Sequence, residues 1–383
     1  MVWAGTLLNM AMRVKWLLGV GQQLNRCGGY WPDVLPVCTP APNAPRVSAT
    51  VHPFTLERQA SLDAMISLVA SDMNGVNAVI LERMQSKVAL IPELAGHLIA
   101  GGGKRMRPML TLACASLLGY PGTRHHKLAA AVEFIHTATL LHDDVVDGSG
   151  MRRGKRTANL IWGNPASVLV GDFLFSRAFE LMVEDGSLKV LRILSHASAV
   201  IAEGEVEQLT AQRQIDTAED QYLDIIGAKT AALFAAACRV SPVVAEASED
   251  AELALEAYGK NLGIAFQLSD DVIDYASDSA TMGKGVGDDF RDGKMTLPVI
   301  LAYARGSEAD RKFWRAAIGG DRVADDDLAH AIQLLKQTDA LADTVERARH
   351  YGRRAIDALA MFPASKARSA LTEAAEFAIA RAY

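Results

Sequence analysis

Apolar residues recur at three- and four-residue intervals along most of this chain, which is the spacing of one face of an α-helix. Alternating strand patterns are scarce. The spacing is clearest in one early stretch formed by Leu62, Met65, Ile66, Val69, Met73, Val76 and Ile80. The pattern predicts an all-α protein that is helical from about Phe54 onward and packs as a single large bundle.

Turn-forming residues divide this pattern into separate helices. They cluster at 101–103 before Pro108, at 120–122, at 148–154, at 163–165 and at 283–293. We find no internal repeat and no low-complexity tract. One helical domain over residues 54–383 is therefore the simplest organisation.

The first fifty residues differ in composition from the rest and hold three tryptophans and five prolines. The segment MRVKWLLGV has features of a signal or amphipathic anchor, but no convincing small-residue cleavage site follows it. We interpret residues 1–53 as a disordered leader outside the core. A start codon assigned too far upstream, or a targeting role, stays open.

Composition narrows the class of protein. Half of the residues are hydrophobic and the net charge is −6, with no basic stripe, which argues against nucleic acid as a partner. The cysteines, Cys27, Cys38, Cys114 and Cys238, are too scattered for a disulfide framework or a zinc site. We find no apolar run of transmembrane length. Together these features predict a cytoplasmic protein.

One acidic signature occurs twice, as LLHDDVVDG with Asp143, Asp144 and Asp147 and as QLSDDVIDY with Asp270, Asp271 and Asp274. Each copy ends a long apolar helical pattern, where the helix dipole disfavours anions. Carboxylates at i and i+4 share a helix face and repel one another unless a cation neutralises them. Each copy is therefore predicted to be half of a divalent-metal site for a polyanion; two solvated acidic helix ends are the alternative.

The helix face that bears the first signature also carries His136 and Thr139, at about 100° per residue. Upstream, GGGKRMRP combines free backbone N–H groups with Lys104 and Arg107, and Pro108 suits the first turn of the next helix. Downstream, GSGMRRGKRT supplies Arg152 and Arg153. This arrangement predicts two anion sites, one bridged to the carboxylates by metal ions and one held directly by Lys and Arg.

Taken together, these strings resemble the long-chain trans-isoprenyl (polyprenyl) diphosphate synthases, of the octaprenyl, solanesyl or decaprenyl kind. The resemblance runs from about residue 55 to the C-terminus through GGGKRMRP, EFIHTATLLHDDVVDGSGMRRG, GAKTAALF, AFQLSDDVIDY with GKGVGDDFRDGK, and KMTLP. It implies an isoprenoid-synthase bundle around a deep apolar cavity, and a Mg²⁺-dependent prenyltransferase that condenses isopentenyl diphosphate onto an allylic diphosphate.

The resemblance also implies roles for individual positions. The isopentenyl diphosphate site matches Lys104, Arg107, His136 and Arg153. The two aspartate-rich motifs are Asp143, Asp144 and Asp147 with Asp270, Asp271 and Asp274, and they hold three Mg²⁺ around the allylic diphosphate. The metal ligands among them are Asp143, Asp147 and Asp270. The positions that contact the allylic diphosphate are Arg152, Lys229, Gln267 and Lys284, with Thr230 after Lys229 and Lys294 as a further candidate.

Product length is expected to depend on the helix wall below the first signature. One helical turn rises about 5.4 Å, close to one extended isoprene unit, and Ala138 and Thr139 stand at that depth. Short-chain members of the family tend to place aromatic residues there, so the resemblance implies a tunnel open to a long tail. Phe134 points to the opposite side of the helix, which predicts a packing role. A floor is expected on a neighbouring helix, among Phe173, Leu174 and Phe175.

The main hypothesis is a long-chain all-trans polyprenyl diphosphate synthase for quinone (ubiquinone) side chains. The resemblance implies a homodimer, and its apolar product would allow loose membrane association. A class I terpene cyclase is an alternative that needs no second diphosphate site. A non-catalytic partner subunit is a second alternative, but such subunits usually lose one acidic cluster or the basic loop, and this chain keeps both.

Overall fold

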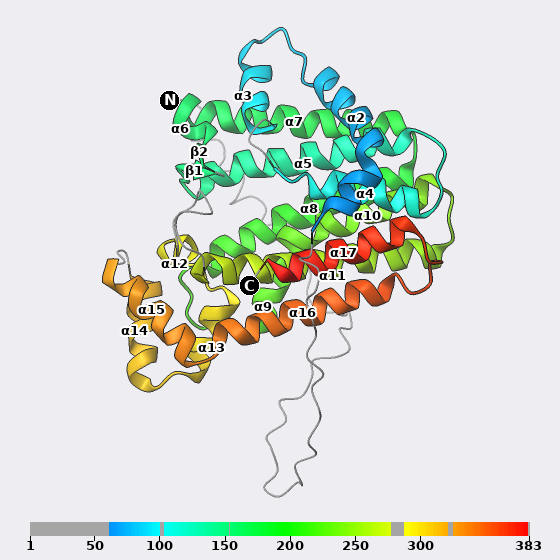
Figure 1. Ribbon diagram of the computed structural model, residues 1–383. Coiled ribbons are helices and arrows are strands. Elements are labelled where there is room, and N and C mark those ends of the chain that lie inside the picture. The colour runs from blue at the N-terminus through cyan, green and yellow to red at the C-terminus, as the bar shows by residue number, and fades with distance from the viewer. Residues whose placement is uncertain (1–60, 100–102, 153, 277–286, 321–324, 382–383) are drawn as a thin grey trace, which may run out of the picture. The chain divides into compact units, whose positions relative to one another are not determined.

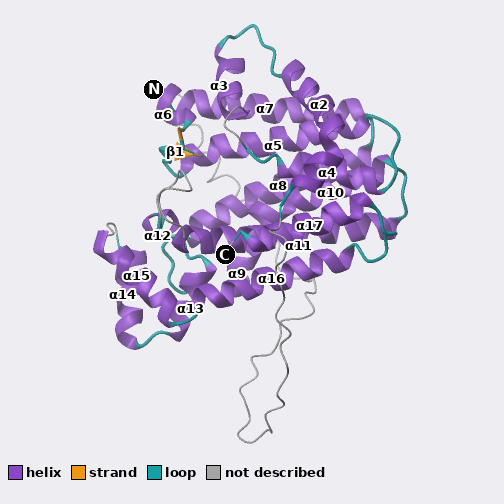
Figure 2. Cartoon of the chain, viewed as in Figure 1, coloured by secondary structure: helices purple, strands orange, loops and turns teal. Residues whose placement is uncertain are grey.

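Helices carry nearly all the secondary structure, as the apolar spacing predicts. The computed structural model describes residues 61–381 apart from 100–102, 153, 277–286 and 321–324, so the predicted leader 1–53 lies outside the described residues. Within the described part, the only strands are β1 (Met151–Arg152) and β2 (Lys155–Arg156), which pair as a short antiparallel hairpin (Figure 2). The predicted all-α fold is confirmed.

The N-terminal half of the bundle contains α2 (Asp63–Arg83), α3 (Leu90–Ile99), α4 (Met106–Leu117), α5 (Arg124–Val146), α6 (Ala158–Trp162), α7 (Asn164–Asp185) and α8 (Leu188–Ala211). Helices α5 and α7 pack along each other over most of their lengths (Figure 1). Pro108 lies in the first turn of α4, as expected. The predicted break at 120–122 falls between α4 and α5. Of the predicted break at 163–165, only Gly163 lies between helices, because α7 already begins at Asn164, and its positive φ of 85° favours glycine.

The C-terminal half contains α9 (Glu219–Ile226), the π-helical turn η1 (Gly227–Ala231), α10 (Ala232–Val244), α11 (Glu249–Ala276), α12 (Asp288–Arg291), α13 (Leu297–Arg305), α14 (Glu308–Gly319), α15 (Asp325–Gln337), α16 (Ala340–Ala358) and α17 (Lys366–Ala380). Helix α11 packs most extensively on α16 and α10. Its C-terminal end and that of α5 lie on the same side of the molecule, near α12 and β1 (Figure 1). This arrangement brings the two acidic signatures to one end of the bundle.

Two groups of buried apolar side chains hold the helices together. The larger fills the space between α2, α4, α5, α7, α8, α10, α11 and α17. The smaller joins α9, α11 and α16 to α13–α15 and is centred on Phe290 and Trp314. Because α5 and α11 are anchored in these cores, their acidic ends are held at fixed positions.

Helix α2 illustrates how tertiary packing selects among apolar residues. Met65, Val69, Val76 and Ile80 are buried, whereas Ile66 is 49% exposed, so the prediction that Ile66 belongs to the core stripe is wrong. Ile66 follows Met65 by one residue and is rotated by about 100°, which turns it away from the bundle.

A membrane span was not expected from the sequence, but α2 is long and apolar enough to qualify by length and composition. No other described helix does. Helix α2 packs on α4, α5 and α17, and its buried stripe faces them. Its apolar residues therefore contribute to the core of the bundle.

Candidate active site

A cavity of about 610 Å³ opens where α5 and α11 end, and it gathers most of the site residues predicted from the sequence. Those that line it are Lys104, Arg107, His136, Thr139, Asp143, Asp144, Asp147, Arg152, Lys229, Thr230, Gln267, Asp270, Asp271, Asp274 and Lys294. They come from the start of α4, from α5, the β-hairpin, η1, α11 and the segment after α12. The two acidic signatures therefore share one cavity, as their duplication predicts.

The other predicted positions are either outside the described residues or away from the lining of this cavity. Arg153 and Lys284 lie outside the described residues. Ala138 is 0% exposed and packs in the core, while its neighbour Thr139 faces the cavity. Phe134 is a packing residue, as expected. The proposed floor residues, 173–175, do not line the described cavity.

Each acidic signature divides into one buried and two outer aspartates. The middle members Asp144 and Asp271 are 0% and 1% exposed, respectively. Asp144 Oδ1 accepts from Arg152 Nε at 2.8 Å and from its Nη2 at 2.7 Å. Asp271 accepts from the Tyr222 hydroxyl, and from Gln267 Nε2 at 3.0 Å. The middle carboxylates therefore anchor the helix ends, and the outer ones are available to a cation.

Lysine or arginine side chains lie against three of the outer carboxylates. Lys229 Nζ is 3.9 Å from Asp143 Oδ2 and 2.7 Å from Glu205 Oε2. Lys294 Nζ is 3.3 Å from Asp147 Oδ2. Arg381 Nη2 is 2.6 Å from Asp270 Oδ1. The acidic ends thus draw positive charge toward them from three distant parts of the chain.

The electrostatics of the acidic ends indicate how strongly negative charge is concentrated there. Burial raises the pKa of Asp143 to about 7; Lys229 opposes the rise, and Glu205 and Asp147 add to it. Burial alone would lower the pKa of Lys294, but the surrounding carboxylates, Asp289 foremost, raise it above its ordinary value. A cation near Asp143 would favour its ionised form.

The donor set fits a hard divalent cation. Asp143, Asp147 and Asp270 offer carboxylate oxygens, the ligands that Mg²⁺ and Ca²⁺ prefer. The buried Oδ2 of Asp144 also has no hydrogen-bond partner among the described residues. These oxygens, together with the cationic side chains that already lie against the outer carboxylates, are what a site for a metal-bound polyanion requires.

A second, cationic group lines the cavity at the start of α4. Arg107 Nη1 is 3.2 Å from His136 Nε2, and its guanidinium stacks 4.4 Å from the centre of the Phe234 ring. Lys104 Nζ lies 4.4 Å from the Phe377 ring centre. Burial, and then the nearby Arg381, lower the pKa of Lys104. Lys104, Arg107 and Arg381 all line this cavity and could bind an anion there.

Close helix packing positions Lys229 in this site. Lys229 lies in η1, a wide helical turn of the kind often found at functional sites. A Cβ atom on Gly204 of α8 would lie 2.7 Å from Ala228 Cβ and 3.0 Å from the Lys229 backbone nitrogen. Only glycine allows α8 to approach η1 so closely, and this contact fixes the root of the Lys229 side chain.

The structure also identifies site residues that the sequence did not single out. Arg381 lines the cavity from the end of α17, and Tyr222 holds Asp271 from α9. Asp289 lies near Lys294 and donates its backbone N–H to Asp274 Oδ2 at 3.2 Å. The GKGVGDDFRDGK string contains Asp289, so a signal existed for it. Arg381 and Tyr222 belong to no recognised string, and only tertiary packing brings them here.

Comparison with known proteins agrees with this geometry. The polyprenyl synthetase family model matches residues 88–335. An octaprenyl diphosphate synthase of Escherichia coli (strain K12) is 46% identical, over 84% of this chain and 99% of the relative.

Two crystal structures also resemble the fold. A polyprenyl synthase from Caulobacter crescentus CB15, complexed with calcium and isoprenyl diphosphate, is 54% identical with a TM-score of 0.82, over 84% of this chain and 99% of that one. A decaprenyl diphosphate synthase from Rhodobacter capsulatus is 52% identical with a TM-score of 0.81, over 84% of this chain and all of that one. This chain belongs to the polyprenyl synthetase family and is a prenyltransferase.

Proposed function

We propose that this protein is a Mg²⁺-dependent, long-chain all-trans polyprenyl diphosphate synthase that adds isopentenyl diphosphate repeatedly to an allylic diphosphate. The observation that carries the proposal is the cavity itself, whose lining combines two acidic helix ends with a cationic group at the start of α4. One side suits a metal-bound diphosphate and the other suits a diphosphate held directly by protein cations.

The acidic side suits the allylic diphosphate. Asp143, Asp147 and Asp270 would hold Mg²⁺, with three ions in each site. Bound Mg²⁺ would neutralise the charge that develops on the departing diphosphate. Lys229 lies between Asp143 and Glu205, where it can donate to the same diphosphate. Thr230 Oγ1 donates to Gln267 Oε1 at 2.9 Å, and this bond orients the Gln267 amide at the cavity wall.

The cationic side suits isopentenyl diphosphate. Lys104, Arg107 and His136 would bind its diphosphate, with Arg381 close enough to join them. Arg107 is pre-positioned by its contacts with Phe234 and His136, so little side-chain freedom is lost on binding. The substrate double bond would then be held toward the allylic carbon that loses its diphosphate.

The apolar part of the cavity suits the hydrocarbon ends of both substrates. Met106, Leu140, Phe234 and Phe266 contribute to its lining, and an apolar surrounding keeps water from an allylic cation. No dedicated nucleophile is required, because the released diphosphate can accept the proton that ends each cycle. Thr139, a small residue on the wall, leaves space for a growing chain.

A long-chain polyprenyl diphosphate, used for a quinone side chain, is the product that the similar proteins support best. The similar proteins carry the names octaprenyl and decaprenyl diphosphate synthase. We therefore propose a product in this size range for ubiquinone side chains. A terpene cyclase would not need the cationic group around Lys104, and a non-catalytic subunit would not need two complete acidic signatures.

An extension assay tests the proposal. The full chain is incubated with labelled isopentenyl diphosphate, an allylic primer and Mg²⁺, and the dephosphorylated products are resolved by chromatography. We expect a ladder that ends at a long polyprenol and disappears with EDTA. A cyclic hydrocarbon would favour the cyclase, and absence of extension would exclude the synthase.

The two-site arrangement has its own test. Lys104→Ala should raise KM for isopentenyl diphosphate by at least about tenfold and change KM for the allylic primer much less, because a phosphate contact is lost on one side only. Lys366→Ala, an exposed lysine on α17, serves as the matched control. Equal effects on both substrates would contradict the assignment.

We also propose a cytoplasmic homodimer that associates loosely with membranes through its product. Exposed apolar residues on α7 support a partner surface, since Leu169 is 67% and Val183 is 64% exposed. Two helical residues 14 apart lie close to one face. Light scattering should give a dimer mass, and Val183→Glu should shift it toward the monomer. A wild-type monomer would contradict the proposal.

A further inference from the structure

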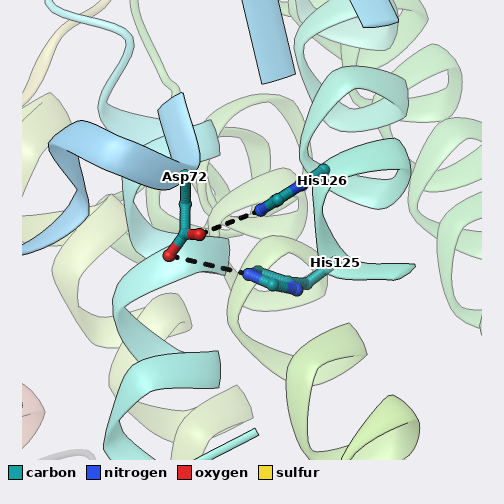
Figure 3. Close-up of side chains that lie close together, drawn as sticks. All are labelled: Asp72, His125 and His126. Carbon is teal, nitrogen blue, oxygen red and sulfur yellow. Dashed lines mark hydrogen bonds and ion pairs between the residues drawn. The ribbon is translucent and has the colours of Figure 1, made fainter. Parts of the chain in front are cut away.

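A second cluster of potential metal ligands lies away from the active site. It consists of Asp72 on α2 and the adjacent His125 and His126 in the first turn of α5 (Figure 3). His125 and Asp143 are separated by eighteen residues of one helix, or about 27 Å at 1.5 Å per residue. The cluster is therefore separate from the carboxylates of the catalytic cavity.

The ligand atoms converge on one point. His126 Nε2 lies 3.0 Å from Asp72 Oδ1, and His125 Nε2 lies 3.8 Å from Asp72 Oδ2. One ligand atom from each of the three residues falls within 4.8 Å of the others. Ligands about 2.1 Å from a tetrahedral ion stand about 3.4 Å apart, so small side-chain rotations bring these atoms to a shared ion.

Packing holds both imidazoles in place. His125 is 4% exposed, and its ring packs edge-on against Tyr120 with centroids 5.4 Å apart. His126 lies flush against α2, where a Cβ atom on Gly75 would approach its Nδ1 to 2.5 Å. Asp72 remains partly exposed, so an ion can enter from solvent. Two of the three ligands are thus ordered before an ion binds.

The described protein contacts leave both ring nitrogens of His125 without a normal hydrogen bond. Its Nε2 is too far from Asp72 for a normal hydrogen bond, and its buried Nδ1 has no partner among the described residues. Buried polar groups usually have a partner. The two rings are only 4.4 Å apart between centroids, so both imidazoles lie within reach of one ion. Two imidazoles beside one carboxylate form a ligand set that suits a divalent transition metal.

We propose that Asp72, His125 and His126 bind one divalent transition-metal ion of the Zn²⁺ class, with solvent completing its coordination. Two imidazoles and one carboxylate suit Zn²⁺ or Co²⁺, whereas the all-carboxylate set of the catalytic cavity suits Mg²⁺. The ion would link α2 to the start of α5. It therefore acts as a structural cross-link at the end of α5 opposite the catalytic aspartates.

Cobalt spectroscopy tests this site in the full chain. Metal-free protein is titrated with Co²⁺ in excess Mg²⁺, which keeps the catalytic carboxylates occupied. We expect one Co²⁺ per chain with the strong visible absorption of four- or five-coordinate cobalt, lost when Zn²⁺ is added. Zn²⁺ should also raise the melting temperature. Absence of this absorption in the wild-type chain would overturn the proposal.

Substitutions locate the ion. His126→Ala and Asp72→Asn should each weaken Co²⁺ binding about 10- to 100-fold, since even outer contacts of metal ligands carry effects of that size. His196→Ala removes an exposed histidine on α8 and should leave binding unchanged. If the absorption persists in both ligand variants, the ion is bound elsewhere and the proposal fails.

A pair of glycine variants tests the geometry without removing a ligand. Gly75→Ala should push the His126 ring aside and weaken Co²⁺ binding at least about tenfold. Gly96→Ala adds the same methyl group on α3, where nothing lies within 4 Å of the new carbon, and should have no effect. Equal Co²⁺ affinities in the two variants would contradict the placement of His126.

Discussion

The two acidic helix ends have the same sequence pattern but different surroundings. At the end of α5, the buried Asp144 is paired with the guanidinium of Arg152. At the end of α11, the buried Asp271 is held by the neutral groups of Tyr222 and Gln267, and burial, together with the charge of Asp289, raises its pKa well above the usual range. A repeated signature therefore gives one carboxyl group paired with a cation and one held by neutral hydrogen-bond donors.

The outer aspartates differ as well. On α5, Asp143 and Asp147 each face a lysine from another part of the chain. On α11, Asp270 faces Arg381, while Asp274 accepts a backbone N–H from Asp289. The comparison teaches that similar spacing fixes which carboxylates share a face, and that neighbouring elements decide what each carboxylate does.

The largest expected effect is loss of turnover at either helix end. Asp143→Asn and Asp270→Asn should each lower kcat by about 10²–10³ or more, because each removes a metal ligand that stabilises the transition state. Steady-state assays measure the loss, and circular dichroism should show an intact fold. Asp250→Asn, an exposed position in the first turn of α11, is the control. Near-wild-type rates in one variant would show that only one helix end binds metal.

Substitution of the two buried aspartates should lower the free energy of unfolding by different amounts. Asp144→Asn leaves Arg152 without its charged partner and should cost about 2–3 kcal/mol. Asp271→Asn leaves no cation unpaired and keeps an oxygen for the Tyr222 hydroxyl, but it turns an amide donor toward Gln267 Nε2, so a smaller loss of about 1 kcal/mol is expected. Urea unfolding in EDTA measures both values. Equal losses would show that the charged partner of Asp144 and the neutral partners of Asp271 contribute equally to stability.

In the absence of metal, the pH dependence of folding stability should reveal the raised pKa of Asp143 at the end of α5. The pKa of Asp143 is raised from 3.8 to about 7, so the folded chain holds a proton that the unfolded chain has lost between these values. Stability should then fall as pH rises from about 4 to about 7, and Asp143→Asn should remove that part of the slope. Denaturation curves in EDTA across this range test the sign.

Metal binding should show the same linkage. At about pH 6, cation binding at Asp143 must displace a proton, and at about pH 8 it need not. Calorimetry in two buffers of different ionisation enthalpy measures the proton release. A proton count that does not change with pH would contradict the raised pKa.

The smallest expected effect concerns product length and involves only α5. Thr139 lies on the face of α5 that also carries Asp143 and Asp147. Thr139→Phe should shorten the product by a few isoprene units while turnover continues, since a ring would block the wall about one turn from Asp143. Ala138→Phe should instead destabilise the fold by about 1–3 kcal/mol, because Ala138 is fully buried. Chromatography and thermal melting distinguish the two. Shortened products from a stable Ala138→Phe variant would place the tunnel on the other side of the helix.

Much of the fold and of the site follows from local sequence. Apolar spacing predicted the helices, and the spacing of Asp143 and Asp147 predicted that both would share a face. The glycine and proline clusters marked breaks between helices. These features depend only on helix geometry, which is the same in every helix.

The remainder depends on contacts between distant segments. Ala138 and Thr139 are successive residues, so their side chains point about 100° apart around the helix axis. The sequence does not show which of the two directions faces the cavity. The π-helical turn at 227–231 has no clear signature, although it positions Lys229. Arg381 and Tyr222 join the site only because α17 and α9 pack beside α11.

The lysine and arginine side chains that lie against Asp143, Asp147 and Asp270 have a consequence for the resting protein. Their positive charges offset part of the mutual repulsion of these carboxylates. A metal ion that binds these carboxylates would replace their contacts with Lys229, Lys294 and Arg381. The three side chains would then lie beside the phosphate oxygens of the substrate. The same side chains thus contact the carboxylates and also line the cavity where a bound diphosphate would require positive charge.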